Sequence, residues 1–189
     1  IIGIIVVTII IVIMVFINLS KNRETAEKYL FLAKQYYYSG DITKAIEQIE
    51  IIERNFSNYS VYNFALLLKG DMYYANENYA KAVEEYEKAL SKLKNKDLIP
   101  FALYSTAKSY QALKDYGKAI IFFKDFIEKY PDHYLAPDVY LSLALSYENK
   151  GEKELAQETF QKITILYPQT SWEELSKEAL KKYEIKSKK

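Results

Sequence analysis

Hydrophobic residues follow two different patterns along this chain, and the change comes near residue 20. Residues 1–17 are uncharged, and Thr8 is the only polar side chain among them. Further along, apolar positions recur three, four and seven residues apart, as at Ala33 and Tyr36. The pattern predicts one continuous apolar segment followed by a series of amphipathic helices.

We expect residues 1–19 to form a transmembrane helix that contacts the lipid bilayer from Ile1 to Leu19. About 17 apolar residues is the lower limit for a spanning helix. A segment alone in lipid must satisfy its own backbone hydrogen bonds, which favours a helix over a strand despite the many Ile and Val residues. A cleaved signal peptide is the alternative, but no small-x-small cleavage site follows the segment. Residues 20–28 are then expected to be a juxtamembrane linker running into the first amphipathic helix.

The remaining hydrophobic pattern repeats with a period of 37 residues. Small residues recur at Ala33, Gly70, Ala107 and Ala144. A tyrosine follows each of them by three places, at Tyr36, Tyr73, Tyr110 and Tyr147. A second set of small residues recurs at Ala45, Ala82, Ala119 and Ala156. A fixed period between about 20 and 50 residues is typical of stacked repeats, so we expect four helical hairpins over residues 24–169.

Turn and stop residues mark the ends of the expected helices. Gly40 lies in a short polar turn that closes the first helix of the first hairpin. Pro100 and Pro137 are 37 residues apart and suit the first position of a helix, where the missing N–H costs nothing. Pro131 and Pro168, again 37 residues apart, are expected to terminate second helices because proline cannot continue a helix.

A last helix is expected to close the array. Ser171 and Glu174 match a capping box, which predicts a helix over residues 170–185. One side of this helix is rich in Lys and Glu, as expected of a terminal cap that covers the apolar face of the last repeat. Residues 186–189 would form a short basic tail.

Composition excludes several classes of function. Lys and Arg number 26 against 25 Asp and Glu, so the net charge of +1 gives no reason to expect nucleic acid binding. The absence of cysteine excludes disulfides and thiolate metal sites. The single histidine, His133, has no Cys or second His with which to form a metal site or a nucleophile dyad, so we interpret it as a solvated loop residue. No glycine-rich phosphate loop is present. We therefore expect no enzymatic activity, no cofactor and no metal.

The matched positions resemble the tetratricopeptide repeat family over about residues 24–185. The large first-helix position of that family corresponds to Tyr29, Leu66, Leu103 and Tyr140. Its bulky second-helix position corresponds to Ile49, Tyr86, Phe123 and Phe160. The chain departs from the family in repeat length, with 37 residues instead of about 34. The resemblance implies an all-α, right-handed solenoid of four hairpins with a capping helix, preceded here by the transmembrane helix.

The segment from Lys129 to Gly151 further looks like the bacterial cell-envelope branch of this family. The layout resembles the membrane-anchored ancillary subunit of the protein-export translocon. This resemblance implies a non-enzymatic, membrane-anchored module that binds partner proteins as an accessory of protein export or envelope protein folding. The alternative is a structural scaffold subunit of a larger envelope machine, for division, outer-membrane assembly or a motor-associated ring. An enzyme regulator working through carboxylates alone would need two convergent acidic residues, which the spacing does not supply.

The expected location is a bacterial inner membrane, crossed once. The resemblance favours repeats in the periplasm. Lys21 and Arg23 follow the apolar segment and favour the cytoplasmic side by the positive-inside rule. Both orientations therefore stay open.

The family lines a concave groove with the first helix of each hairpin, and the resemblance assigns partner-facing positions to this chain. They are Leu30, Lys34, Tyr37 and Tyr38, then Phe64, Leu67, Asp71 and Tyr74, then Phe101, Tyr104, Lys108 and Gln111, and finally Leu141, Glu148 and Asn149. An aromatic groove with scattered charge suits an extended or helical partner segment anchored by apolar side chains. The alternative for any one of the aromatic residues is packing against a neighbouring helix. A clamp for a C-terminal carboxylate is not expected, because Leu30 and Lys34 hold the positions where that clamp carries Lys and Asn.

Overall fold

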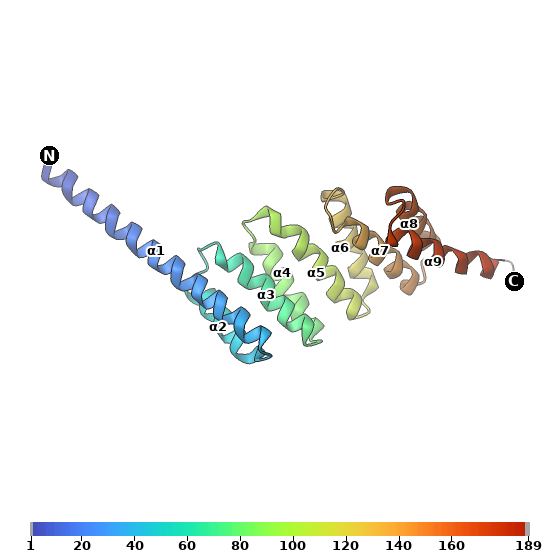
Figure 1. The fold of residues 1–189 in the computed structure, drawn as a ribbon, viewed down its shortest axis with the longest axis horizontal. Helices are drawn as coiled ribbons and strands as arrows, with labels where there is room; N and C mark the ends of the chain where they lie inside the picture. The colour runs from blue at the N-terminus through green and yellow to red at the C-terminus, as the bar shows by residue number, and fades with distance from the viewer. Residues whose placement is uncertain (1, 188–189) are drawn as a thin grey trace. The chain divides into compact units, whose positions relative to one another are not determined.

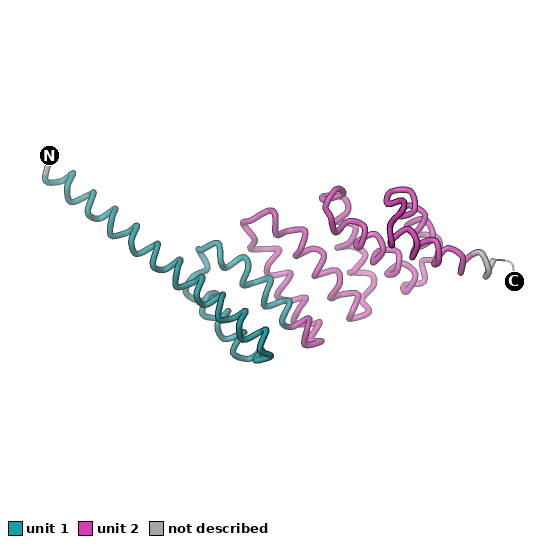
Figure 2. The backbone as a smooth tube through the Cα atoms, in the orientation of Figure 1, with its two compact units in different colours: residues 1–72 teal, residues 73–189 magenta. Residues whose placement is uncertain are grey.

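The structure is a computed structural model that describes the backbone of residues 2–187 and the side chains of residues 3–183. All regular elements in this part of the chain are helical, which confirms the all-α fold class (Figure 1). They are α1 (Ile2–Tyr38), α2 (Ile42–Asn55), α3 (Val61–Ala75), α4 (Tyr79–Lys92), the short 3-10 helix η1 (Lys96–Leu98), α5 (Ile99–Ala112), α6 (Tyr116–Lys129), α7 (Ala136–Lys150), α8 (Lys153–Leu166) and α9 (Ser171–Ser187). The chain divides into two compact units, residues 1–72 and 73–189, and the boundary falls inside α3 (Figure 2).

In the first unit, the apolar segment and the first helix of the first repeat are one continuous helix, α1. Side chains 3–19 are exposed, whereas Ala26, further along α1, is fully buried. Residues 20–28, expected to be a linker, are helical instead. That stretch holds no Gly or Pro, and Arg23 Nε lies 3.5 Å from Glu27 Oε1 one turn later. Nothing in the sequence therefore interrupts the helix between the apolar segment and the repeat.

The hairpin partner of α1 is α2, which buries one apolar stripe. Ala45, Ile49 and Ile52 have no exposed surface, and their spacing of three and four residues places them on one face of the helix. An ion pair within the same unit ties α2 to α3, with 3.2 Å between Lys69 Nζ and Glu53 Oε2. Both side chains are largely buried, so the two charges satisfy one another away from water.

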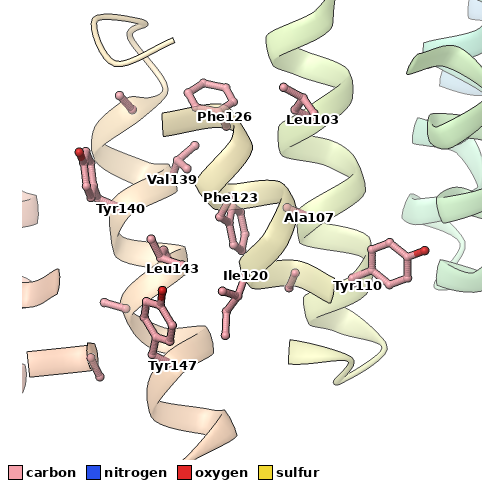
Figure 3. Close-up of a cluster of buried hydrophobic side chains, with 14 of the residues drawn as sticks. Leu103, Ala107, Tyr110, Ile120, Phe123, Phe126, Val139, Tyr140, Leu143 and Tyr147 are labelled. Atoms are coloured by element: carbon pink, nitrogen blue, oxygen red, sulfur yellow. The ribbon is translucent and has the colours of Figure 1, made fainter. Parts of the chain in front are cut away.

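In the second unit, each long helix packs on the next one from α4 through α9. The core of these contacts is aromatic, because Phe123 and Phe126 of α6 and Phe160 of α8 are fully buried. Figure 3 shows Phe123 and Phe126 between the side chains of α5 and α7. Burial of such side chains contributes about 1.5–3 kcal/mol each to stability.

The small residues of the 37-residue period lie where helices pack closely. Every alanine of the two matched sets has no exposed surface, and Gly70 is buried. A larger side chain at these positions would hold the two helices of a hairpin apart. The hydrophobic period therefore marks helix contacts, as the sequence predicts.

A residue with left-handed backbone geometry follows the first helix of each hairpin. The φ angle is 84° at Gly40, 58° at Glu77, 60° at Lys114 and 92° at Gly151, four positions 37 residues apart. The N–H of the next residue donates to the carbonyl of the matched tyrosine, Tyr36, Tyr73, Tyr110 or Tyr147, at 2.9 Å in all four cases. This geometry is a Schellman-type helix end, which satisfies a carbonyl that the helix itself leaves unpaired.

Three of the four second helices are capped by the side chain that follows this turn. Asp41, Asn78 and Asp115 each accept a hydrogen bond from a lysine N–H three residues later, at 3.1, 3.4 and 3.1 Å respectively. The matched residue in the fourth repeat is Glu152, whose side chain makes no such cap. The fourth repeat therefore lacks one stabilising contact that the others share.

Several helix starts differ from the expected ones by one residue. Pro100 and Pro137 occupy the second position of α5 and α7, where the backbone N–H also has no partner within the helix. At the start of α9, Thr170 Oγ1 accepts from the Glu173 N–H at 3.3 Å, and Glu173 Oε2 accepts from the Gln169 N–H at 2.7 Å. The cap is thus one residue earlier than the expected pair of Ser171 and Glu174, because Ser171 is already helical. Of the expected basic tail, residues 186–187 belong to α9, and residues 188–189 lie outside the described part of the chain.

Candidate partner-binding surface

The groove residues expected in the third repeat lie on the side of α5 that faces α7. The Tyr104 hydroxyl donates a hydrogen bond to Asp138 Oδ2. One turn further, Lys108 Nζ donates to Ser142 Oγ at 3.5 Å. The two contacts join successive first helices, so the polar ends of these side chains are already held within the array.

Gln111 extends the same line of contacts by one more turn. Its Nε2 donates to the Ser142 carbonyl at 3.1 Å and to Ser146 Oγ at 3.0 Å. Ser146 Oγ in turn donates to the Ser142 carbonyl at 2.8 Å. These serines are buried, and their small size lets α5 and α7 approach closely enough for the long side chains of α5 to reach across.

Burial has an electrostatic consequence at Tyr104. Burial, together with the Asp138 carboxylate beside the hydroxyl, raises the pKa of Tyr104 far above its usual value. The phenol therefore stays neutral, and remains a hydrogen-bond donor to Asp138, at alkaline pH values at which an exposed tyrosine ionises. Tyr104 is thus one of the expected groove residues, and its hydroxyl also makes a structural hydrogen bond between α5 and α7.

Phe101 lies at the start of α5 and packs against the turn between α6 and α7. Its ring centroid is 5.5 Å from that of His133 and 6.2 Å from that of Tyr134. His133 is also 5.5 Å from Phe126, and its Nδ1 accepts from the Leu135 N–H at 3.2 Å. His133 is therefore a half-buried packing residue, and the interpretation of it as a solvated loop histidine is wrong.

In the fourth repeat, the expected groove residues differ in their surroundings. Leu141 is half-buried, whereas Glu148 and Asn149 are exposed. The Asn149 side chain donates to the Leu145 carbonyl of its own helix at 2.8 Å. Burial and the neighbouring Glu148 carboxylate raise the pKa of Tyr183, on α9, to about 12. Tyr183 of the capping helix therefore lies beside Glu148, which keeps its exposed surface.

Tyr74, at the end of α3, belongs to the second unit. Its ring is perpendicular to that of Tyr79, with 5.2 Å between the centroids. Burial, with Tyr79 nearby, raises the pKa of Tyr74. Tyr74 therefore packs partly against its own hairpin, and the rest of its ring is open to solvent.

The first unit carries the other expected groove residues. On α1, Tyr38 is 83% exposed and stacks obliquely on Tyr37 with 5.6 Å between ring centroids, Lys34 is exposed, and Leu30 is half-buried. On α3, Phe64 is 45% exposed, Leu67 is half-buried and Asp71 is exposed. The exposed rings of Tyr38 and Phe64 are apolar surface that a partner segment can cover.

Sequence reasoning did not identify Asp138, Ser142 and Ser146 as neighbours of the groove residues. They stand 34 and 35 residues after their partners. That separation is one period less about one helical turn, which is the offset expected when a long side chain reaches back to the next first helix. A search for polar pairs at this offset would have found them.

Fold and surface together define a helical-repeat scaffold whose first helices carry the groove residues, and within the second unit α5 and α7 share one side-chain-lined face. Residues 32–100 match a profile described as Tetratricopeptide repeat, and residues 101–133 and 138–170 match a second profile of the same description. This chain belongs to the tetratricopeptide repeat family. Repeats of this family bind other proteins, so the chain is a protein–protein interaction scaffold by fold.

Solved structures with the same fold share little sequence with this chain. A tetratricopeptide repeat protein from Parabacteroides merdae ATCC 43184 is 19% identical, with a TM-score of 0.72 over 84% of this chain and 60% of that one. A MamA structure from Desulfovibrio magneticus RS-1 is 21% identical, with a TM-score of 0.64 over 77% of both chains. Another MamA structure is 22% identical, with a TM-score of 0.62 over 78% of this chain and 74% of that one. Comparison with curated protein sequences found no significant match.

Proposed function

We propose that this protein is a membrane-anchored interaction module of a bacterial envelope, which holds segments of partner proteins on the shared face of its first helices. Within that class we place it as an accessory of protein export or envelope protein folding, in an inner membrane with the repeats in the periplasm. The observation that carries the proposal is α1, which joins an exposed apolar segment to the first repeat without a break.

The exposed segment of α1 supports the membrane anchor. Ile4 and Phe16 are each 71% exposed, and no side chain from residue 3 to residue 19 is buried. Among the described residues, α1 is the helix long and apolar enough to cross a bilayer, a test that a signal sequence also passes. Leaving so large an apolar surface in water is unfavourable, whereas lipid accommodates it, and a helix satisfies its backbone hydrogen bonds there.

The chemistry of the shared face supports a polypeptide as the partner. In the first unit, exposed aromatic surface at Tyr38 and Phe64 provides apolar anchor sites. In the second unit, the amide and hydroxyl groups of α5 are held in place by α7. A preorganised surface of this kind loses little side-chain entropy when a partner binds.

The first experiment is the simultaneous change of Tyr37, Tyr74 and Tyr104 to Ala. Partner capture from crosslinked membranes is expected to fall at least tenfold, while the helical content measured by circular dichroism stays nearly constant. Tyr104→Phe is the control that keeps the ring but removes the hydrogen bond to Asp138. Capture unchanged in the triple variant would reject the shared face as the binding site, and a loss of helical content would assign the three tyrosines to the core.

Orientation can be tested directly because the chain has no cysteine. Lys153→Cys places one thiol at an exposed position at the start of α8. A membrane-impermeant maleimide is expected to label this thiol in intact spheroplasts if the repeats face the periplasm. Labelling only after lysis would reject the periplasmic placement but would not contradict the proposed binding of partner proteins.

A structural subunit of a larger envelope machine is the second candidate. It is favoured by apolar residues on the outer side of second helices, where Ile121 is 64% exposed and Ile165 is 76% exposed. Such residues suit a permanent interface more than a transient one. Identification of the proteins crosslinked to the chain separates the two candidates, since the export channel supports the first and a multi-subunit ring supports the second.

A further inference from the structure

The surroundings of Tyr110 in the third repeat and of the matched Tyr147 in the fourth repeat differ on the side of the second helices. In the third repeat, the rings of Tyr110 on α5 and Phe122 on α6 stack with 5.6 Å between centroids and 20° between planes. The Tyr110 hydroxyl donates to Glu87 Oε1 on α4 at 2.6 Å. Lys118 Nζ lies 4.9 Å from the centre of the Tyr110 ring. The space between α4 and α6 is thus occupied by the chain's own Phe122.

One period later, the residue that fills this space is missing. The positions matched to Tyr110 and Phe122 hold Tyr147 and Thr159, and the position matched to Lys118 holds Leu155. The result is a cavity of about 370 Å³ between α6, α7 and α8, lined by Tyr147, Leu155 and Thr159 among others. The ring that stacks on Tyr110 therefore has no counterpart at Tyr147, which keeps 8% of its surface exposed at the edge of the cavity.

We propose that this cavity binds a phenylalanine side chain of a partner polypeptide, with its ring against the exposed edge of Tyr147. The occupant follows from the chain itself, because Phe122 shows which group fits against the matched tyrosine. The floor is apolar, with Leu143 and Tyr140 of α7 beneath the opening. A volume above about 300 Å³ is within the range of pockets that bury a ligand group.

The charges at the rim favour a neutral occupant. The two positive charges of Lys124 and Lys162 are balanced by the two negative charges of Glu128 and Glu158, and all four side chains line the cavity. Their charges cancel, so the rim attracts neither an anion nor a cation as such. Charged side chains spaced around an apolar floor can instead form hydrogen bonds with the main chain that flanks a bound phenylalanine.

A neighbouring hollow favours a polypeptide over a free aromatic compound. A second cavity of about 620 Å³ shares Tyr140 and Lys162 with the first and extends along the turn from Pro131 to Tyr134. A peptide whose phenylalanine occupies the first cavity can therefore continue into the second. None of the residues that line the first cavity belongs to the first-helix face of the proposed function, so this site is separate from it.

The test uses the full chain in phospholipid nanodiscs and the peptide acetyl-Gly-(4-fluoro-Phe)-Gly-amide, observed by fluorine NMR. Wild-type protein is expected to shift and broaden the fluorine signal at millimolar peptide. Thr159→Phe should weaken binding at least tenfold, because the new ring fills the cavity as Phe122 fills its own. Thr164→Phe, on the same helix but away from the cavity, is the matched control and should bind as the wild type does.

Phe122→Thr provides the reciprocal test, because it should open a second cavity and double the amount of peptide bound. If Phe122→Thr does not fold, as judged by circular dichroism, the comparison of Thr159→Phe with Thr164→Phe decides alone. No binding to the wild type, or equal binding to Thr159→Phe, would overturn the proposal. If acetyl-Gly-Leu-Gly-amide displaced the fluorinated peptide as well as unlabelled acetyl-Gly-Phe-Gly-amide does, the aromatic specificity would be overturned. Equal binding of free fluorobenzene would overturn the polypeptide partner.

Discussion

Glu77 and Lys114 adopt the left-handed backbone conformation, and glycine occupies the matched positions of the first and fourth repeats. Their φ angles, 58° and 60°, are close to those expected for left-handed geometry, in which the Cβ atom crowds the following carbonyl. The helix end needs a left-handed residue in every repeat. Two of the four repeats have a residue with a side chain there, which raises the conformational energy of the folded chain. These two residues are therefore sites of stored backbone strain.

Lys114→Gly is expected to stabilise the chain by about 0.5–1 kcal/mol. Left-handed geometry costs a residue with a side chain about 1–2 kcal/mol, and the greater freedom of glycine in the unfolded chain offsets about 0.5–1 kcal/mol of that gain. Urea unfolding followed by circular dichroism measures the change. Gly151→Lys is the reverse substitution at the matched site and should destabilise by a similar amount. Identical unfolding curves for both variants would show that φ does not limit stability here.

Tyr110 links stability to alkaline pH. Burial, with the Glu87 carboxylate that accepts its hydrogen bond, raises the pKa of Tyr110 to about 12. The unfolded chain ionises this phenol near pH 10. The contribution of Tyr110 is therefore fully present below pH 10 and is lost as pH rises toward 12, because the unfolded state releases its proton first.

Tyr110→Phe is expected to lose less melting temperature between pH 10 and pH 12 than the wild type does. At pH 7 the variant should be less stable by about 1 kcal/mol, through loss of the hydrogen bond to Glu87. Thermal unfolding at a series of pH values from 8 to 12 gives both quantities. Tyr104 and Tyr183 share the raised pKa, so some alkaline loss remains in the variant. Parallel curves for the two proteins would contradict the role of Tyr110.

At the scale of helices, the 37-residue period predicted most of what the structure contains. It located the hairpins α1–α2, α5–α6 and α7–α8, because a small side chain such as Ala107 or Ala156 is the condition for two helices to pack closely and leaves a direct mark on the sequence. Side-chain contacts between helices leave no such mark. The hydrogen bond from Tyr104 to Asp138 depends on which rotamer a long side chain adopts. The cavity beside Thr159 depends on the absence of a ring that only comparison with Phe122 reveals.

The α7–α8 contact is expected to depend on the size of Ala156. Ala156→Leu adds three carbon atoms at a position with no exposed surface and should cost about 1–3 kcal/mol through overpacking. Lys153→Leu adds an apolar side chain at an exposed position of the same helix and should stay within about 0.5 kcal/mol of the wild type. Urea unfolding of both variants measures the difference. Equal stability would show that the matched alanines do not set the distance between helices.

At the scale of the whole molecule, the proposed function combines a scaffold surface with an apolar helix. The family assignment establishes the scaffold. The anchor and the partner remain proposals, since fold alone fixes neither the bilayer nor the bound segment. The two proposed sites use different sides of the hairpins, so one chain can hold two polypeptides at once.

In the proposed arrangement, the unbroken course of α1 sets how far the first hairpin stands from the membrane. Ala26, the first fully buried residue of the repeats, comes seven residues after Leu19, at the end of the apolar segment. Seven helical residues rise about 10 Å. With the apolar segment in a bilayer, the first hairpin lies at the level of the lipid headgroups. No flexible linker separates it from the anchor, so it cannot reorient freely. The first hairpin can then contact only polypeptides that lie close to the surface of the same membrane.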